Sequence, residues 1–466
     1  MKQLDYSRGS ITGNIMRASL PMLVAQILNL LYSIIDRIYI ARISGVGSIA
    51  IGGVGLCFSI IIMVTAFTNL YGMGGAPLCS MARGSRDLQR AENIMNISYF
   101  LLFYTSFFLI IIFEIFAKPL LFLFGASENN IVYALPYLRI YLLGTTFSML
   151  TTGLNNFINA QGFPRTGMTT VIIGAIANII LDPIFIFLFK LGVEGAAIAT
   201  VISQILSAIF VLKFLRSSSA ELHLKLPSFS EFKKHLKTAR EITVLGLSGF
   251  VMMFTNSAVN IACNSVLSRY GGDIYVSVMT ILMSVRQILE TPLMSVAEGS
   301  SPIVSYNYGA LNLKRAKKTF LYMTVIAVAY TFVIWAFIEL KPIWFISIFT
   351  SDISILDAAL PALHIYFLGF VFQALQVCAQ ATFKALGKKK RAIFFSIFRK
   401  LIIAFPLTFL LPGLFSQGVN GVFQAEPISN LIGGLASYTT MLITILSEFK
   451  HLESRNLGNE KQNFEY

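Results

Sequence analysis

Charged residues are scarce in this chain of 466 residues. Asp, Glu, Lys and Arg make up 12% of it and hydrophobic residues 56%, whereas a soluble domain usually has roughly 25% charged residues. The mean hydropathy is +0.72. These values exclude an ordinary soluble domain and predict an all-α polytopic membrane protein.

Cysteine and histidine are also few, with four residues of each. The cysteines, Cys57, Cys79, Cys263 and Cys378, are scattered in or beside apolar runs and form no CxxC motif, which excludes a disulfide framework and gives no sign of a metal centre. His364 is the only histidine inside an apolar run, and there is no HExxH motif or P-loop. We therefore expect no enzyme, no cofactor and no direct use of ATP.

Long hydrophobic runs, in contrast, are abundant. A helix needs about 20 apolar residues to cross the hydrocarbon core of a bilayer, and the chain contains twelve runs of that kind. The predicted fold therefore has twelve transmembrane helices, over residues 18–41, 49–76, 96–117, 132–160, 166–189, 195–215, 243–268, 275–305, 320–340, 356–384, 392–411 and 422–447.

The basic residues gather in alternate loops. Since cytoplasmic loops are enriched in Lys and Arg, this pattern places both termini in the cytoplasm and accounts for the net charge of +14. Motifs for nucleic-acid binding are absent from the sequence, so no nucleic-acid partner is expected. One long polar segment divides the runs into two sets of six, which predicts an N-lobe (1–215), a cytoplasmic connector (216–240), a C-lobe (241–448) and a cytoplasmic tail (449–466).

The two sets of six runs resemble each other at a spacing near 225 residues. Because each set has an even number of spans, both lobes have the same orientation and form a parallel internal repeat. Transporters built from such repeats hold their substrate between the halves and rock one half against the other, so the repeat predicts transport. The matching pairs are APLCSMARGSRDLQRAENI (76–94) with SPIVSYNYGALNLKRAKKT (301–319), LPYLRIYLLG (135–144) with LPALHIYFLG (360–369), and GVEG (192–195) with GVNG (418–421).

A few carboxylates fall inside the apolar runs, where a charge costs roughly 2.5–3.5 kcal/mol on insertion scales. At a rise of ~1.5 Å per residue, Asp36, Asp182 and Thr200 lie in the outer half of the bilayer, within ~5 Å of one depth. Asn178 lies one turn from Asp182 on the same helix face. Two carboxylates, an amide and a hydroxyl suit a proton or a hard cation such as Na⁺.

Structural explanations exist for each acid alone. Asp36 could pair with the adjacent Arg37 as an interfacial anchor, and Asp182, which precedes Pro183, could satisfy backbone groups at a kink. The repeat favours a coupling role, since the C-terminal half lacks the acidic pair. Asp36 corresponds there to Cys263, Asp182 to the region of Leu407 and Thr408, and Thr200 to Glu426. Weaker coupling candidates are Glu290, Glu298 and Glu426.

The sequence resembles the MATE (multidrug and toxic compound extrusion) family, in its MepA-like bacterial branch. The resemblance covers essentially all twelve spans. Its most specific motifs are LYSIIDRIYIA (31–41), NIILDPIFIF (178–187), GVEGAAIATVISQ (192–204) and SPIVSYNYGA (301–310). It implies export of organic cations and amphipathic drugs, driven by inward H⁺ or Na⁺, across the cytoplasmic membrane of a bacterium. It also implies two six-helix lobes around a central cleft, and we expect a monomer.

The resemblance also implies a cation site in the N-lobe. In family members that have this site, an Asp of the first helix, an Asn and an Asp of the fifth and a Thr of the sixth form it. These residues correspond here to Asp36, Asn178, Asp182 and Thr200, with Tyr141 and Asn155 of the fourth span as expected neighbours. Another branch binds Na⁺ through acids of the seventh and tenth helices. This chain has Asn256 in the seventh span, and the stretch IYFLGFVFQALQVCAQATF (365–383) of the tenth span contains no acid, so we expect no C-lobe site of that type.

A substrate cleft lined by Met and aromatic side chains would suit varied drugs. The first span offers Met22, Gln26, Asn29 and Tyr32 on faces near that of Asp36. The alternative function is a lipid-linked oligosaccharide flippase of related fold. It would need a basic cleft for a pyrophosphate headgroup, and the main basic residues noted within the spans are Arg139 and Arg286.

Overall fold

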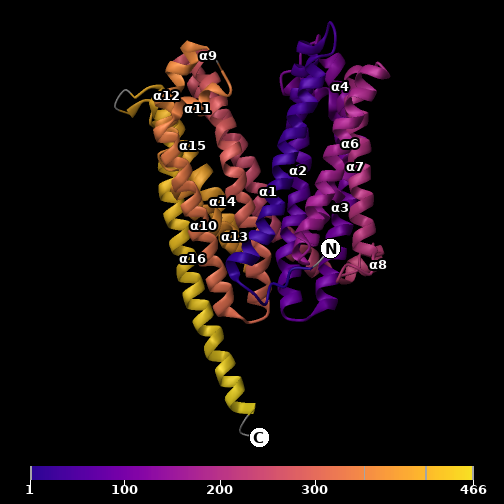
Figure 1. The fold of residues 1–466 in the computed structure, drawn as a ribbon, viewed down its shortest axis with the longest axis vertical. Coiled ribbons are helices and arrows are strands. Elements are labelled where there is room, and N and C mark those ends of the chain that lie inside the picture. Colours follow the sequence, from indigo (N-terminus) through magenta and orange to yellow (C-terminus); the bar gives the residue numbers. More distant parts are fainter. Residues whose placement is uncertain (1–2, 351, 415–416, 464–466) are drawn as a thin grey trace. The chain divides into compact units, whose positions relative to one another are not determined.

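The computed structural model describes residues 3–350, 352–414 and 417–463, and over these residues every regular element is a helix (Figure 1). The N-terminal half contains α1 (Ile11–Ala41), α2 (Gly47–Gly84), α3 (Leu88–Leu123), α4 (Ile131–Leu143), α5 (Thr145–Ala160), α6 (Pro164–Pro183), the π-helix η1 (Ile184–Leu188), α7 (Gly192–Arg216) and the short α8 (Phe229–Lys234). The C-terminal half contains α9 (Leu236–Gly309), α10 (Leu313–Leu340), α11 (Pro342–Ser347), α12 (Ile353–Phe367), α13 (Phe370–Ala385), α14 (Lys389–Ile397), the π-helix η2 (Phe398–Ala404), α15 (Phe405–Leu410) and α16 (Val419–Asn463).

Nine helices of the described residues are long and apolar enough to cross a membrane, or ten when α12 and α13, bent by 47°, are taken as one broken span. α9 is 74 residues long, about 110 Å at the helical rise, which is far more than one crossing of a ~30 Å core needs. Its backbone breaks at Gly272, with φ 70° and ψ −164°, so it holds two spans. The predicted span 132–160 is divided at Gly144 into α4 and α5. The helices thus agree with twelve spans, and the predicted all-α fold class is confirmed.

The chain divides into two compact units, with an unexpected assignment of its first helix. One unit comprises Leu20–Phe250 with the residues up to Asp5, and the other comprises Tyr6–Ser19 with the residues from Val251 onward. Arg315 holds the early segment in the second unit, because its guanidinium donates to the carbonyls of Tyr6, Arg8 and Gly9 at 2.7–3.0 Å. Residues 6–19 are therefore grouped apart from the rest of the predicted N-lobe.

The segment predicted as a connector (216–240) packs against the N-terminal unit. Leu222 and Leu224 are buried in the N-terminal unit, and the Leu222 amide donates to Gln161 at 2.9 Å. Arg83, at the end of α2, forms an ion pair with Glu221. The predicted connector is thus docked on its unit. The segment predicted as a tail (449–466) is helical to Asn463 as part of α16, and its last three residues lie outside the described part.

The repeat seen in the sequence is also present in the backbone geometry. Arg86 and Leu311, which correspond by the repeat, are two of the few non-glycine residues with positive φ, at 63° and 57°. Each is followed by a helix whose N-cap side chain accepts from the backbone three residues on. Gly195 and Gly421 also correspond, and each touches the backbone of the preceding span so closely that a Cβ atom would lie under 3.0 Å from it. The two halves therefore share turns and helix contacts.

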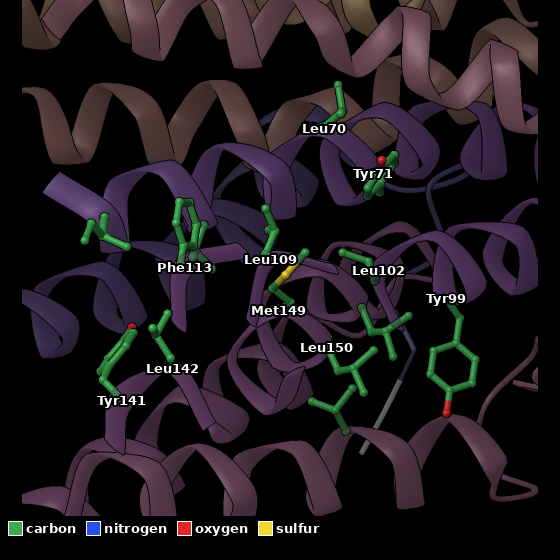
Figure 2. Packing of buried hydrophobic residues seen from close by; sticks show 14 of the residues in the cluster. Leu70, Tyr71, Tyr99, Leu102, Leu109, Phe113, Tyr141, Leu142, Met149 and Leu150 are labelled. Atoms are coloured by element: carbon green, nitrogen blue, oxygen red, sulfur yellow. The ribbon is translucent and has the colours of Figure 1, made fainter. Parts of the chain in front are cut away.

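The N-terminal unit is built around a continuous apolar core. Leu102 of α3, and Leu142 and Met149 of α4 and α5, are fully buried there, and Figure 2 shows them packed with Leu150 and Tyr141. Lipid tails are as apolar as these side chains, so the core is held together mainly by close van der Waals packing and little by the hydrophobic effect. This core holds α4, α5 and α7 in the positions from which they surround the acidic residues.

Candidate functional site

The site begins where α6 ends in the N-terminal unit. Asp182 is fully buried next to the last residue of α6, and Pro183 is followed at once by the π-helix η1. Single π-helical turns inside membrane helices occur frequently at functional sites. Asn178, one turn earlier, donates from Nδ2 to Asp182 Oδ1 at 3.1 Å and lies 3.4 Å from Thr200 Oγ1 of α7. The structure thus links three of the four residues that the sequence predicts for coupling.

Asp36 completes this group from α1. Its side chain is buried, with 7% exposed, and its carboxylate interacts electrostatically with that of Asp182. The neighbouring Arg37 is exposed and lies over the ring of Phe58, at 4.5 Å from the ring centroid. Arg37 also interacts electrostatically with Asp36, so the interfacial anchor stays an alternative explanation for this acid. We call Asp36, Asn178, Asp182 and Thr200 the acidic site.

Three buried oxygen atoms at the acidic site lack a hydrogen-bond donor in the described part of the chain. Asp36 Oδ1, Asp182 Oδ2 and Asn178 Oδ1 are buried and lack a hydrogen-bond partner among the described residues. All three atoms are acceptors. A buried acceptor without a donor is unfavourable, and either a proton or an oxygen-binding cation would satisfy it. The residue types therefore fit H⁺ or Na⁺, although no group of three His, Cys, Asp or Glu that would hold a metal occurs within the described ranges.

Three tyrosines surround the acidic site. Tyr32 of α1 and Tyr137 of α4 both interact electrostatically with Asp36 and Asp182. Tyr141, one turn after Tyr137, is buried, interacts electrostatically with Tyr32 and has its ring stacked with that of Tyr137 at 6.4 Å between centroids. Tyr32 and Tyr141 were among the residues predicted from the sequence, whereas Tyr137 was not. The spacing of four residues from Tyr141, which places both rings on one helix face, was the available signal.

Other predicted residues lie in different surroundings. Asn155 donates to the Gly167 carbonyl at 3.2 Å, which ties α5 to α6. In α1, Met22, Gln26 and Tyr32 are half-buried and Asn29 is exposed. These positions neither support nor oppose a substrate-binding role, which stays a prediction.

The weaker acidic candidates belong to ion-pair networks of the C-terminal unit. Glu426 of α16 pairs with Arg286, Arg399 and Lys400, and Glu290 pairs with Arg286. Glu298 interacts electrostatically with Lys384. The sequence analysis counted Arg286 among the basic residues of the spans but overlooked Arg399 and Lys400, which are adjacent and buried in η2. They stand inside an apolar run, so the signal was present.

Comparison with known proteins gives consistent matches along the chain. The MatE family model matches residues 21–184 and again 249–410, which are the two halves of the repeat. The multidrug export protein MepA of Staphylococcus saprophyticus is 26% identical over 452 residues, and that of Staphylococcus aureus (strain MRSA252) is 25% identical over 450 residues. Each alignment covers 96% of this chain and 96% of the relative.

Solved structures of related transporters have the same fold. An outward-facing multidrug resistance MATE family transporter of the MOP superfamily has a TM-score of 0.88 at 24% identity and covers 97% of this chain and 99% of its own. A MATE structure in the bent conformation gives 0.89 at 24% identity, covering 97% and 100%. A MOP superfamily transporter from Pyrococcus furiosus, described as having a binding pocket of reversed polarity, gives 0.87 at 23% identity with the same coverage. Together with the two family-model matches, which span most of the sequence, these findings show that the chain belongs to the MatE family.

Proposed function

We propose that this protein is a secondary active multidrug efflux transporter. It exchanges organic cations or amphipathic drugs for inward-moving H⁺ or Na⁺ by alternating access, and couples the two at the acidic site. It acts as a monomer in the cytoplasmic membrane of a bacterium, with both termini in the cytoplasm, and carries out no catalysed reaction. The MepA relatives, which are multidrug export proteins, support the substrate class.

The observation that carries the proposal is the set of buried acceptor oxygens at the acidic site. Two buried carboxylates interact electrostatically inside an apolar unit, and each has an oxygen without a donor within the described part of the chain. Two ionised carboxylates in such surroundings repel each other and lose hydration. A cation that binds between them removes both penalties, so occupancy of this site changes the energy of the unit substantially.

Coupling requires that the cation and the drug bias one element with two arrangements. α1 is suited to that role, since it contains Pro21, which lacks an amide hydrogen and weakens the helix at that turn. The division between the two compact units also falls between Ser19 and Leu20. In the proposed cycle, cation binding at Asp36 and Asp182 lets α1 bend or repack and weakens drug binding. The drug then leaves outward, and the loaded protein returns and releases the cation inward.

The first span is the proposed substrate-binding element. Met22, Gln26, Asn29 and Tyr32 precede Asp36 along α1, and Tyr32 also interacts electrostatically with Asp36. Tyr32 would thus belong both to the drug-binding surface of α1 and to the surroundings of the acidic site. Cation binding at Asp36 could then alter the surface that contacts the drug. Small-molecule drugs and the lipid bilayer are thus the expected partners.

A lipid-linked oligosaccharide flippase is less well supported. It would require basic side chains free to bind a pyrophosphate. The buried Arg286, Arg399 and Lys400 all form ion pairs with Glu426 in the described structure, and the cavity beside Lys400 has room for about one water-sized ligand, which is too small for a pyrophosphate. Binding of a lipid-linked anion without binding of a cationic dye would nevertheless favour the flippase.

The test is ethidium efflux from cells that carry Asp36→Asn or Asp182→Asn. Each substitution keeps the size of the side chain but removes its exchangeable charge, so ion-dependent efflux should be lost while the protein still reaches the membrane. Asp357→Asn, at an exposed aspartate of α12, is the matched control and should leave efflux unchanged. Efflux at the wild-type level in both acidic-site variants would refute the coupling proposal.

A further inference from the structure

The C-terminal unit contains a cavity at the positions that correspond by the repeat to the acidic site. Cys263, Thr408 and Glu426 line it, and the sequence repeat aligns these residues with the acidic pair and the threonine of the N-terminal unit. Cys263 Sγ and Thr408 Oγ1 are 3.7 Å apart. Tyr366, which corresponds to Tyr141, and Lys400 also line the cavity. The same place in the two halves therefore holds different chemistry.

The ion-pair network that reaches this second place through Lys400 and Glu426 has a net positive charge, whereas the acidic site has two acids and no base. Arg399, Lys400 and Glu426 are each at least nine-tenths buried, and Lys400 Nζ donates to both Glu426 oxygens at 3.0–3.1 Å. The connected network consists of three basic and two acidic side chains, with one positive charge in excess, namely Arg286, Arg399, Lys400, Glu290 and Glu426. An excess charge in an apolar interior is strongly unfavourable unless a counter-charge accompanies it.

Hydrogen-bond donors of this network remain available at the cavity. An ammonium has three donors, and two of those of Lys400 are directed at Glu426. The Tyr366 hydroxyl accepts from Arg286 at 3.0 Å, which leaves its own proton free to donate. Arg399 Nε is buried and without a hydrogen-bond partner in the described structure. Thus, over the described residues, this network has hydrogen-bond donors without acceptors, whereas the acidic site has acceptors without donors.

The cavity has room for about one water-sized ligand. A drug molecule does not fit, and neither does a phosphate ester. Met279 and Met283 form part of its wall, and unbranched methionine side chains adjust readily to a slightly larger occupant. Size and charge together select a single monovalent ion of negative sign.

We propose that this cavity is a binding site for one small monovalent anion, chloride in the cell, held by the Lys400 ammonium and the Tyr366 hydroxyl. The anion supplies the counter-charge that the five-residue network lacks. It stabilises the C-terminal unit while a cation is bound and released at the acidic site of the other unit. The proposal does not depend on which ion or drug the protein transports.

The experiment measures thermal unfolding of the purified full chain in detergent while chloride replaces gluconate at constant ionic strength. Both tryptophans, Trp335 and Trp344, belong to the C-terminal unit, so their fluorescence reports its unfolding. Ligand binding to the folded state raises the unfolding temperature with ligand concentration. The expected result for the wild type is a rise that saturates with chloride, and bromide should substitute for chloride.

Three variants separate anion binding from a general salt effect. Lys400→Gln makes the network neutral and removes the ammonium that would hold the anion. The chloride-dependent rise in unfolding temperature should therefore vanish. Glu290→Gln, outside the cavity lining, adds a second excess positive charge and should lower the chloride concentration for half-maximal effect. Lys388→Gln removes a lysine that pairs with Glu448 at 2.6 Å elsewhere in the unit and should behave as the wild type.

Several results would overturn the proposal. One is a wild-type unfolding temperature that is equal in chloride and gluconate, which would mean that Lys400 carries no charge or that the network tolerates the excess. Another is retention of the full rise in Lys400→Gln. If Lys400→Gln does not fold, Glu290→Gln still decides, because an unchanged or weaker chloride response in that variant also contradicts the charge argument.

Discussion

The two carboxylate oxygens of Asp182 have different surroundings. Oδ1 accepts from Asn178, whereas Oδ2 is buried without a donor among the described residues. This difference orients the carboxylate and leaves one oxygen for a cation. Asp36 contributes another free oxygen from a different helix. The proposed cation binding would therefore depend on individual atoms, with each of the two acids supplying part of the site.

A buried arginine outside the acidic site allows a test of how the connector is held. Arg83 has 5% of its side chain exposed and pairs with Glu221, whereas Arg90 has 61% exposed and lies 3.9 Å from Glu241. Arg83→Gln should lower stability by about 1–3 kcal/mol, because it leaves a partly buried carboxylate without its partner. Arg90→Gln should change stability by less than about 1 kcal/mol. Thermal unfolding in detergent measures both, and equal effects would contradict the docking of the connector through Arg83.

Much of the acidic site could be predicted from single residues, and part of it could not. An aspartate in the apolar run NIILDPIFIF demands a partner, and helical spacing identifies Asn178 as that partner. Tyr137 was missed because a tyrosine in an apolar helix is usual and carries no charge signal. Arg399 and Lys400 were visible in the sequence, but their pairing with Glu426 depends on how η2 packs against α16.

At the scale of helices, the repeat is maintained by close backbone contacts at glycine. A Cβ atom on Gly195 of α7 would lie 2.7 Å from the backbone of Phe185, and one on Gly421 of α16 would lie 2.5 Å from that of Leu411. The Gly195 contact brings α7 against the segment that follows Asp182, so it positions Thr200 near Asn178. Small residues allow such close approach in membrane proteins generally.

These contacts give a prediction for two corresponding glycines. Gly195→Ala and Gly421→Ala should each destabilise the protein by about 1–3 kcal/mol, because the added methyl group meets backbone atoms that cannot move aside. Gly52→Ala, at an exposed helical glycine with nothing within 4 Å, is the control and should be neutral or slightly stabilising. The measurement is the apparent unfolding temperature. Tolerance of alanine at both sites would show that the helices are not held at this distance.

Helix number and order were predictable from hydrophobic length, but helix breaks were less so. Hydropathy gave one span over 132–160 and one over 356–384, and each is formed by two helices with a break at or near glycine. Such a break depends on contacts with other helices, for example those of Gly369 with Pro427. The grouping of residues 6–19 with the C-terminal unit likewise depends on Arg315, which is over 300 residues away in the sequence.

For the whole molecule, the proposed exchange is energetically adequate. One cation that enters down a potential of 100 mV supplies about 2.3 kcal/mol, and a tenfold gradient of a neutral solute costs about 1.4 kcal/mol. One cation can therefore sustain a tens-fold gradient of a neutral drug. A cationic drug also moves against the potential and needs more than one cation.

The most direct measurement of the central claim is ethidium export by the purified protein in lipid vesicles, with pH and Na⁺ gradients imposed separately. In the wild type, at least one of the two gradients should drive export, and dye movement should be accompanied by flux of that ion in the opposite direction. In the Asp36→Asn/Asp182→Asn double variant, neither gradient should drive export and no coupled flux should occur. Driven export by the double variant at the wild-type rate would contradict the account.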